Sequence, residues 1–187
     1  MGAEIDAHDL VQAAAAGDSR GWDDLVERFG ALVWSTARAY GLSPDEGADV
    51  AQTTWLRLAE QLGRLRDGRD RIGVWLASTA RQESLRLLET RVADHADPGQ
   101  EEPAAMAAAT ATPREPEVLL WRVLRDLPEH CRRLLRILSA VPPPDQEELA
   151  AALDLTVADV PAARAACLEE FGYRMASIGI KADAEDS

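Results

Sequence analysis

The apolar residues of this chain recur at intervals of three and four, the spacing that places side chains on one face of an α-helix. The clearest run in the first half is Trp22, Leu25, Val26, Phe29, Leu32, Val33, Thr36 and Ala37. We expect a helix that begins at Ser19, as its N-cap, and ends at Gly41, with this face buried. No alternating strand pattern occurs, so the sequence predicts an all-α fold.

Three further helices are expected in the first half. Leu10 and Val11 open a short one that ends near Gly17. The segment 43–46 (Ser-Pro-Asp-Glu) has the order of a helix start, with a hydroxyl acceptor, a proline in the first turn and a carboxylate three residues on. The helix that follows carries Val50, Trp55, Leu58 and Leu62. Asp70 is expected to cap the last one, through Trp75, Leu76, Thr79, Leu85 and Leu88.

The pattern then stops and resumes, which predicts two small helical domains. Residues 93–115 lack large apolar anchors and contain several prolines, so we expect a flexible linker between a domain at 1–92 and one at 116–176. In the second domain, helices are expected from Pro116, from Pro128 and, capped by Asp145, over Gln146–Leu153, before a last helix that reaches Met175. The polar tail at 177–187 is expected to fray.

Composition favours a cytoplasmic helical protein without a cofactor. Apolar residues make up 47% of the chain, but no run approaches the roughly 18 that a membrane span needs. The first ten residues carry acids and lack the basic and apolar pattern of an export signal. Cys131 and Cys167 stand apart from each other and from any histidine at ligand spacing, so we expect two buried, reduced thiols and no metal site.

Charge is distributed unevenly along the chain. The net charge of -13 is unfavourable for a protein that binds nucleic acid, because phosphate contacts normally come from lysine and arginine. Residues 63–91 nevertheless hold seven arginines against four acids, a balance of +3. Residues 142–187 hold ten acids against three bases, a balance of -7. Any contact with nucleic acid is therefore expected first in the N-terminal domain.

Residues 148–160 have the order of a helix-turn-helix. Small alanines allow two helices to cross closely, Asp154 occupies the turn, and Thr156 is placed to cap the next helix. An alanine-rich helical hairpin without any DNA-binding role has the same pattern, so the motif alone leaves both interpretations open.

Three segments together resemble the extracytoplasmic-function sigma factors, the compact class with only sigma regions 2 and 4. They are residues 49–58, 73–83 and 127–135, and the resemblance extends over about 9–91 and 117–174. It implies a region 2 helical bundle and a region 4 helix-turn-helix. It also implies a transcription initiation factor that binds core RNA polymerase and directs promoter recognition and opening. Promoter DNA is then a partner, and an anti-sigma factor or another protein is a candidate partner.

The resemblance implies that the helix from Asp49 to Leu62 docks on a coiled-coil clamp of the largest polymerase subunit. Four of its residues share one face by their spacing of i, i+3, i+4 and i+7, namely Asp49, Gln52, Thr53 and Leu56. A polar stripe with one leucine suits a helical partner. The alternative is an ordinary solvated face with Leu56 half-buried.

For residues 63–91 the resemblance implies capture of bases flipped from the non-template strand. The candidate DNA contacts are Arg69, Arg71, Trp75, Arg81, Gln82 and Arg86. Arginines would contact phosphates, and an aromatic ring could stack on a base. The alternative places Trp75 in the core, which we favour for that ring, and leaves the arginines as solubilising charges.

Region 4 departs from the pattern expected of a DNA reader. Thr156 and Arg164 are its candidate DNA contacts, yet the expected recognition helix offers mainly alanine and Asp159 around Arg164. Asp154 stands where glycine is usual in the turn. A second hypothesis is therefore a degenerate sigma-like protein that binds polymerase or a regulatory protein, with weak or no DNA reading by region 4.

An enzyme is the least favoured hypothesis. The three histidines, His8, His95 and His130, are scattered, and no phosphate-binding loop or metal-ligand spacing occurs. We expect no catalytic site.

Overall fold

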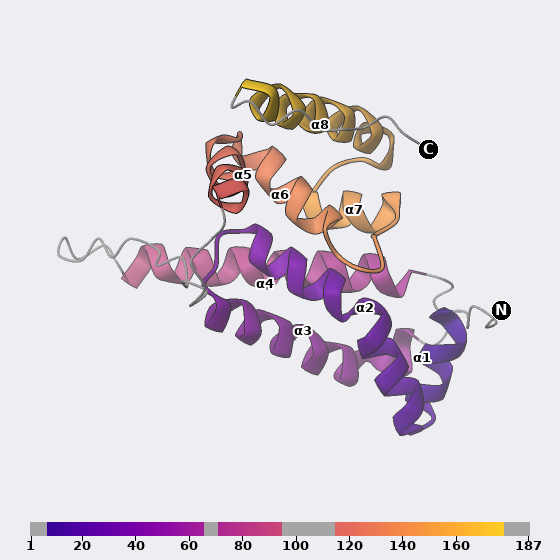
Figure 1. Ribbon diagram of the computed structural model, residues 1–187. Coiled ribbons are helices and arrows are strands. Elements are labelled where there is room, and N and C mark those ends of the chain that lie inside the picture. The colour runs from indigo at the N-terminus through magenta and orange to yellow at the C-terminus, as the bar shows by residue number, and fades with distance from the viewer. Residues whose placement is uncertain (1–6, 66–70, 95–114, 178–187) are drawn as a thin grey trace.

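The computed structural model describes residues 7–65, 71–94 and 115–177 (Figure 1). Every regular element in these ranges is helical, which confirms the expected all-α fold. The elements are α1 (Ala7–Ala15), α2 (Ser19–Ala39), α3 (Pro44–Leu65), α4 (Ile72–Asp94), α5 (Glu115–Asp126), α6 (Glu129–Leu138), α7 (Gln146–Leu153), the 3-10 turn η1 (Val157–Asp159) and α8 (Val160–Ser177). None of the helices in these ranges is both long and apolar enough to cross a membrane.

Side-chain caps set the starts of α2 and α3. The cap of α2 is Asp18, whose carboxylate accepts a hydrogen bond from the Arg20 N–H at 3.0 Å, so the prediction of Ser19 was wrong by one residue. At α3 the expected pair is confirmed: the Ser43 hydroxyl accepts from the Glu46 N–H, and the Glu46 carboxylate accepts from the Ser43 N–H at 2.7 Å. That backbone hydrogen bond lowers the pKa of Glu46. Asp70 lies outside the described residues.

The N-terminal block is a four-helix bundle in which α4 packs against α2 and α3, and α1 packs against α2. The apolar face predicted for α2 is largely buried, since Leu25, Phe29, Leu32 and Val33 are at most 4% exposed. Leu58 of α3 and Leu76 of α4 are fully buried in the same core. Val26 is an exception to the expected face, because it is 39% exposed.

The C-terminal block lies against the N-terminal one, with α6 on α2 and α7 on α4 (Figure 1). The main core accordingly continues into the second block, through Ile137, Leu149, Ala150, Ala152 and Val160. Nothing in the sequence pattern indicated this packing. The expected linker at 93–115 lies outside the described residues except at its ends, where α4 reaches Asp94 and α5 begins at Glu115.

A second, smaller core joins α5, α6 and α8, and a disulfide between Cys131 and Cys167 lies in it. The expectation of two reduced thiols was wrong. The crossing of α6 and α8 brings the two Cα atoms to 5.1 Å, within the range for a disulfide, although the residues are 36 positions apart. Only Val160 and Cys167 are buried in α8, so the disulfide is one of few links between this helix and the rest.

Candidate functional site

The four residues expected to dock on polymerase lie on the side of α3 that faces away from the bundle core. Val50, Thr54 and Leu58 bury the opposite side. Asp49 and Gln52 are exposed, and Thr53 is partly buried. Leu56 is 57% exposed. Single exposed apolar residues are common on protein surfaces, so this exposure is compatible both with docking and with an ordinary solvated face.

A shallow groove of about 180 Å³ separates this stripe from α4. It is lined by Asp49 and Thr53 of α3 and by Glu83 and Arg86 of α4. Glu83 is held by Arg57 at 2.8 Å, which links the two helices beside the groove. The structure therefore places Arg86 next to the candidate polymerase-docking residues.

The candidate DNA contacts on α4 do not form one surface. Trp75, Gln82 and Arg86 share a side of the helix by their spacing, whereas Arg81 is turned by about 100° from Gln82. Gln82 and Arg86 are exposed. Trp75 is partly buried and packs against the main core, which agrees with the core interpretation of its ring. Arg69 lies outside the described residues.

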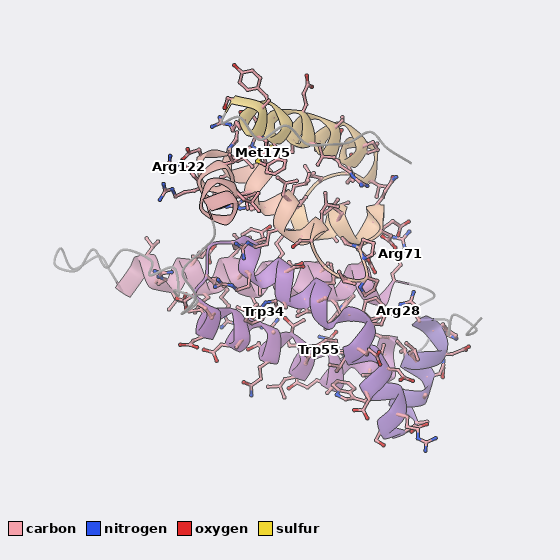
Figure 2. The ribbon with its side chains drawn as sticks, in the orientation of Figure 1. Arg28, Trp34, Trp55, Arg71, Arg122 and Met175 are labelled. Carbon is pink, nitrogen blue, oxygen red and sulfur yellow. A yellow bond between two sulfur atoms is a disulfide. The ribbon has the colours of Figure 1, made fainter. Side chains whose placement is uncertain are left out.

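Arg71 and Arg81 instead meet acids of the C-terminal block. Figure 2 labels Arg71, which lies where the start of α4 approaches α7. Arg81 lies 2.9 Å from an Asp154 carboxylate oxygen, and Arg71 lies 3.6 Å from one of Glu147. The Arg71 side chain is 72% exposed and that of Asp154 equally so. An exposed ion pair such as Arg71–Glu147 contributes only about 0–1 kcal/mol. The Arg81 side chain is only 19% exposed, so its pair with Asp154 is partly buried.

Tyr40 is a contact residue that the sequence analysis missed. Its ring is buried at the end of α2, its hydroxyl donates to the Ala152 carbonyl at 2.8 Å, and the Arg133 guanidinium lies over the ring at 4.6 Å from its centroid. Burial raises the pKa of Tyr40. Tyr40 and Ala152 are 112 positions apart, and no local pattern pairs residues at that separation.

The first turn of α7 sits directly on the start of α4. Asp145 caps α7 as expected: its carboxylate accepts from the Glu148 N–H at 2.8 Å, and the Glu148 carboxylate accepts from the Asp145 N–H at 3.0 Å. The other Glu148 oxygen lies against Gly73, where a Cβ would come within 1.9 Å of it. Gly73 therefore allows a close approach that no other residue type would permit without movement.

Burial of Glu148 at this contact raises the pKa of its carboxyl, and Asp145 adds to the effect, while the Asp145 N–H and Arg28 oppose it. Between pH 4.5 and the raised pKa, the folded protein keeps a proton on Glu148 that the unfolded chain releases. The stability that this group contributes therefore falls as the pH rises through this range.

Glu148→Gln keeps an acceptor for the Asp145 N–H and removes the charge. We expect the variant to be more stable than the wild type at neutral pH, with the difference vanishing near pH 4.5. Urea denaturation of both proteins across this range tests the prediction, and parallel pH profiles would contradict it.

The chain passes from α7 through a tight turn and η1 into α8, in the order expected, with one difference at the start of the second helix. Asp154 ends α7 in the left-handed conformation (φ 60°, ψ 42°), the turn that was predicted there. The expected cap by the Thr156 side chain is wrong: its hydroxyl donates to the Asp159 carboxylate at 2.6 Å and caps no backbone N–H. The 3-10 turn η1 lies between the two helices. Arg164 is exposed on α8 and borders a groove of about 290 Å³ that Asp145 and Leu168 also line.

His130 also lies near the two cysteines, contrary to the expectation from spacing. Ligand atoms of His130, Cys131 and Cys167 all fall within 4.8 Å of one another. The two sulfur atoms are bonded to each other here, so they offer no thiolate to a metal ion.

The helical bundle that contains α3 and α4 matches a known family model. Residues 25–92 match the family model described as Sigma-70 region 2. This span contains the exposed stripe on α3, both arginines that meet the C-terminal block, and Gly73. The curated proteins include no match to the chain.

Two solved structures share the fold over most of the chain. One is CnrH in complex with the cytosolic domain of CnrY, with a TM-score of 0.58, 21% identity, and coverage of 92% of this chain and 99% of that one. The other is the sigma factor RpoE in complex with the anti-sigma factor NepR from Bartonella quintana, with a TM-score of 0.58, 16% identity, and coverage of 82% and 97%. These likenesses extend the sigma-factor fold beyond the region 2 match into the C-terminal block.

Proposed function

We propose that this protein is a cytoplasmic transcription initiation factor of the extracytoplasmic-function sigma type, with a region 2 domain at 1–92 and a region 4 domain at 116–176. It binds core RNA polymerase and directs promoter recognition and opening. The observation that carries the proposal is the region 2 match over 25–92, because this span contains both candidate surfaces, the stripe on α3 and the basic side of α4. Its action is binding and strand capture, and the nucleotide chemistry belongs to the polymerase.

The proposal gives the two tasks to different helices. Asp49, Gln52, Thr53 and Leu56 would contact the polymerase from α3. Gln82 and Arg86 would contact DNA from the exposed side of α4, and Arg71 and Arg81 would join them only after leaving their acidic partners. Because Arg86 lines the groove beside the α3 stripe, DNA held there would run next to the docked polymerase.

The proposed DNA contacts of the C-terminal block have less support than those of α4. Arg164 is exposed on α8 and could reach a phosphate or base edge. The second arginine of α8, Arg174, is already paired with Glu170. Thr156 is bonded to Asp159, which leaves its hydroxyl a poor donor for DNA unless that hydrogen bond breaks. Arg164 is therefore the one arginine of α8 that is not paired within this helix, and a single arginine supplies little phosphate neutralisation.

This shortage of basic residues favours a second candidate function. In that case the protein is a degenerate sigma-like factor that binds polymerase or a regulatory protein, and its C-terminal block reads DNA weakly or not at all. Both solved structures of the same fold are complexes with a protein partner. They support the proposal that this chain also binds a protein, of the anti-sigma kind.

Run-off transcription separates the two candidates. The full chain is added to core polymerase from the source organism with a library of genomic promoter fragments. An initiation factor should co-purify with core enzyme and give promoter-specific transcripts, at least about tenfold above core enzyme alone. Co-purification without specific transcripts would favour the degenerate factor, and absence of both would refute the two together.

A further inference from the structure

Three side chains of metal-binding type gather where α6 crosses α8. Ligand atoms of His130, Cys131 and Cys167 all lie within 4.8 Å of one another. His130 and Cys131 are consecutive residues in the first turn of α6, and Cys167 comes from the middle of α8. In the oxidised form that the structure describes, the two sulfur atoms are bonded to each other. The function proposed above makes no use of this cluster.

Reduction of the disulfide turns the cluster into two thiols and one imidazole. Cytosolic reductants keep most protein thiols reduced, and the proposed function places this protein among them. Two thiols of a glutathione-type reductant are then oxidised to a disulfide. Their two electrons break the bond between Cys131 and Cys167, and each cysteine sulfur takes up one proton. Only the cytoplasmic location is taken here from the proposed function.

The surroundings of the two sulfur atoms determine which cation fits. Both cysteines are at most 2% exposed, in a core that Leu127 and Leu134 share with them. A buried charge is costly in apolar surroundings, whereas a divalent cation with two thiolates is neutral. Thiolate and imidazole favour zinc over magnesium or calcium, which prefer oxygen ligands. Monovalent copper also accepts these ligands, but it would leave one buried negative charge.

We infer that the reduced protein binds one Zn²⁺ through the Sγ atoms of Cys131 and Cys167 and an imidazole nitrogen of His130. Tetrahedral zinc holds such ligands about 3.3–3.8 Å apart, so the 4.8 Å cluster has to contract by roughly one ångström at its widest. His130 is exposed, so its side chain has room to turn towards the sulfur atoms, and water takes the fourth position from that side. The two thiol protons pass to solvent as the ion binds.

This site links α8 to α6 in both redox states. Val160 and Cys167 are the buried residues of α8, so the helix depends on few contacts. The disulfide joins the two helices in the oxidised protein, and the zinc ion joins them in the reduced one. When a glutathione-type disulfide takes two electrons from the thiolates, the sulfur atoms bond to each other and Zn²⁺ is released, while two protons from solvent complete the new thiols. Zinc occupancy therefore follows the redox state of the compartment.

The test uses the full chain, stripped of metal and reduced with a phosphine in the absence of oxygen. Co²⁺ is the probe, because in a tetrahedral thiolate site it gives a sulfur-to-cobalt charge-transfer band. We expect one Co²⁺ per chain, displaced by one Zn²⁺. Zinc at about a hundred times its Kd should raise the thermal midpoint of the reduced protein by about 5–10 °C, because the ion binds the folded chain.

Removal of the imidazole tests the third ligand. His130→Ala keeps both thiols and changes an exposed position. We expect its affinity for zinc, measured in competition with a chromophoric chelator, to fall at least about tenfold, because loss of a residue that merely orients a ligand already costs about 10–100-fold. His8→Ala is the matched control, since His8 lies on α1 in the N-terminal bundle, and it should bind zinc like the wild type. Oxidised wild type has the same sequence and should give no charge-transfer band.

Three results would overturn the inference. Reduced wild type might be titrated without any charge-transfer band, which excludes thiolate ligation. Equal cobalt binding by the oxidised protein would place the ion elsewhere on this acidic chain. Equal zinc affinities of His130→Ala and the wild type would remove His130 from the site. The titration uses no polymerase, so run-off transcription decides the proposed function separately.

Discussion

Replacing Gln52 with lysine and Leu56 with glutamate should abolish binding to core RNA polymerase while leaving helical content unchanged. Both side chains are exposed on α3, and neither contributes to the bundle core. Loss of a buried leucine contact removes about 1.5–3 kcal/mol, and a carboxylate placed in the same interface without a partner costs a similar amount or more. The affinity should therefore fall by roughly a hundredfold or more.

Co-purification of tagged protein with core enzyme measures this effect, and circular dichroism checks the fold. Val26→Glu is the matched control, because Val26 is an exposed apolar residue on a different helix, α2. The control should bind core enzyme like the wild type. Undiminished co-purification of the double variant would exclude the α3 stripe as the docking surface, whatever the outcome for α4.

The individual helices could be predicted from the sequence because local forces determine them. Apolar spacing along α2 and the capping residues Ser43 and Asp145 act within a few residues of their own positions, and each of these predictions is confirmed. The misplaced cap at Ser19 and the misassigned Thr156 have a local cause too. Asp18 accepts the backbone N–H of Arg20 in place of Ser19, and the Thr156 hydroxyl donates to Asp159 instead of accepting from a backbone N–H.

Contacts between the two blocks could not be predicted in the same way. The Tyr40 hydroxyl, the Arg81 guanidinium and the space at Gly73 acquire their partners only when α7 packs on α4. A periodicity analysis finds that a face is apolar but not which other face covers it. The separation of Arg81 from Gln82 and Arg86 on α4 is different, because it follows from helical spacing alone and could have been predicted.

The largest effect on stability is expected at the disulfide that joins α6 and α8. A link between residues 36 positions apart restricts the unfolded chain, and loop-closure entropy gives about 3–4 kcal/mol of stabilisation for a loop of this size. Reduction should therefore lower the thermal midpoint of the protein by roughly 10 °C. Because Cys167 is one of only two buried residues of α8, hydrogen exchange along α8 should accelerate most.

The measurement compares thermal unfolding of the oxidised protein with that of protein kept in excess dithiothreitol. The variant Cys167→Ala cannot form the link, so its midpoint should resemble that of the reduced wild type and should not respond to the reductant. This control separates loss of the covalent link from any general effect of the thiol reagent. Cys131 in that variant should become reactive toward a thiol probe only when α8 opens, since it is 2% exposed. A wild-type midpoint that is unchanged by reduction would show that packing of Leu127, Leu134 and their neighbours holds α8 without the disulfide.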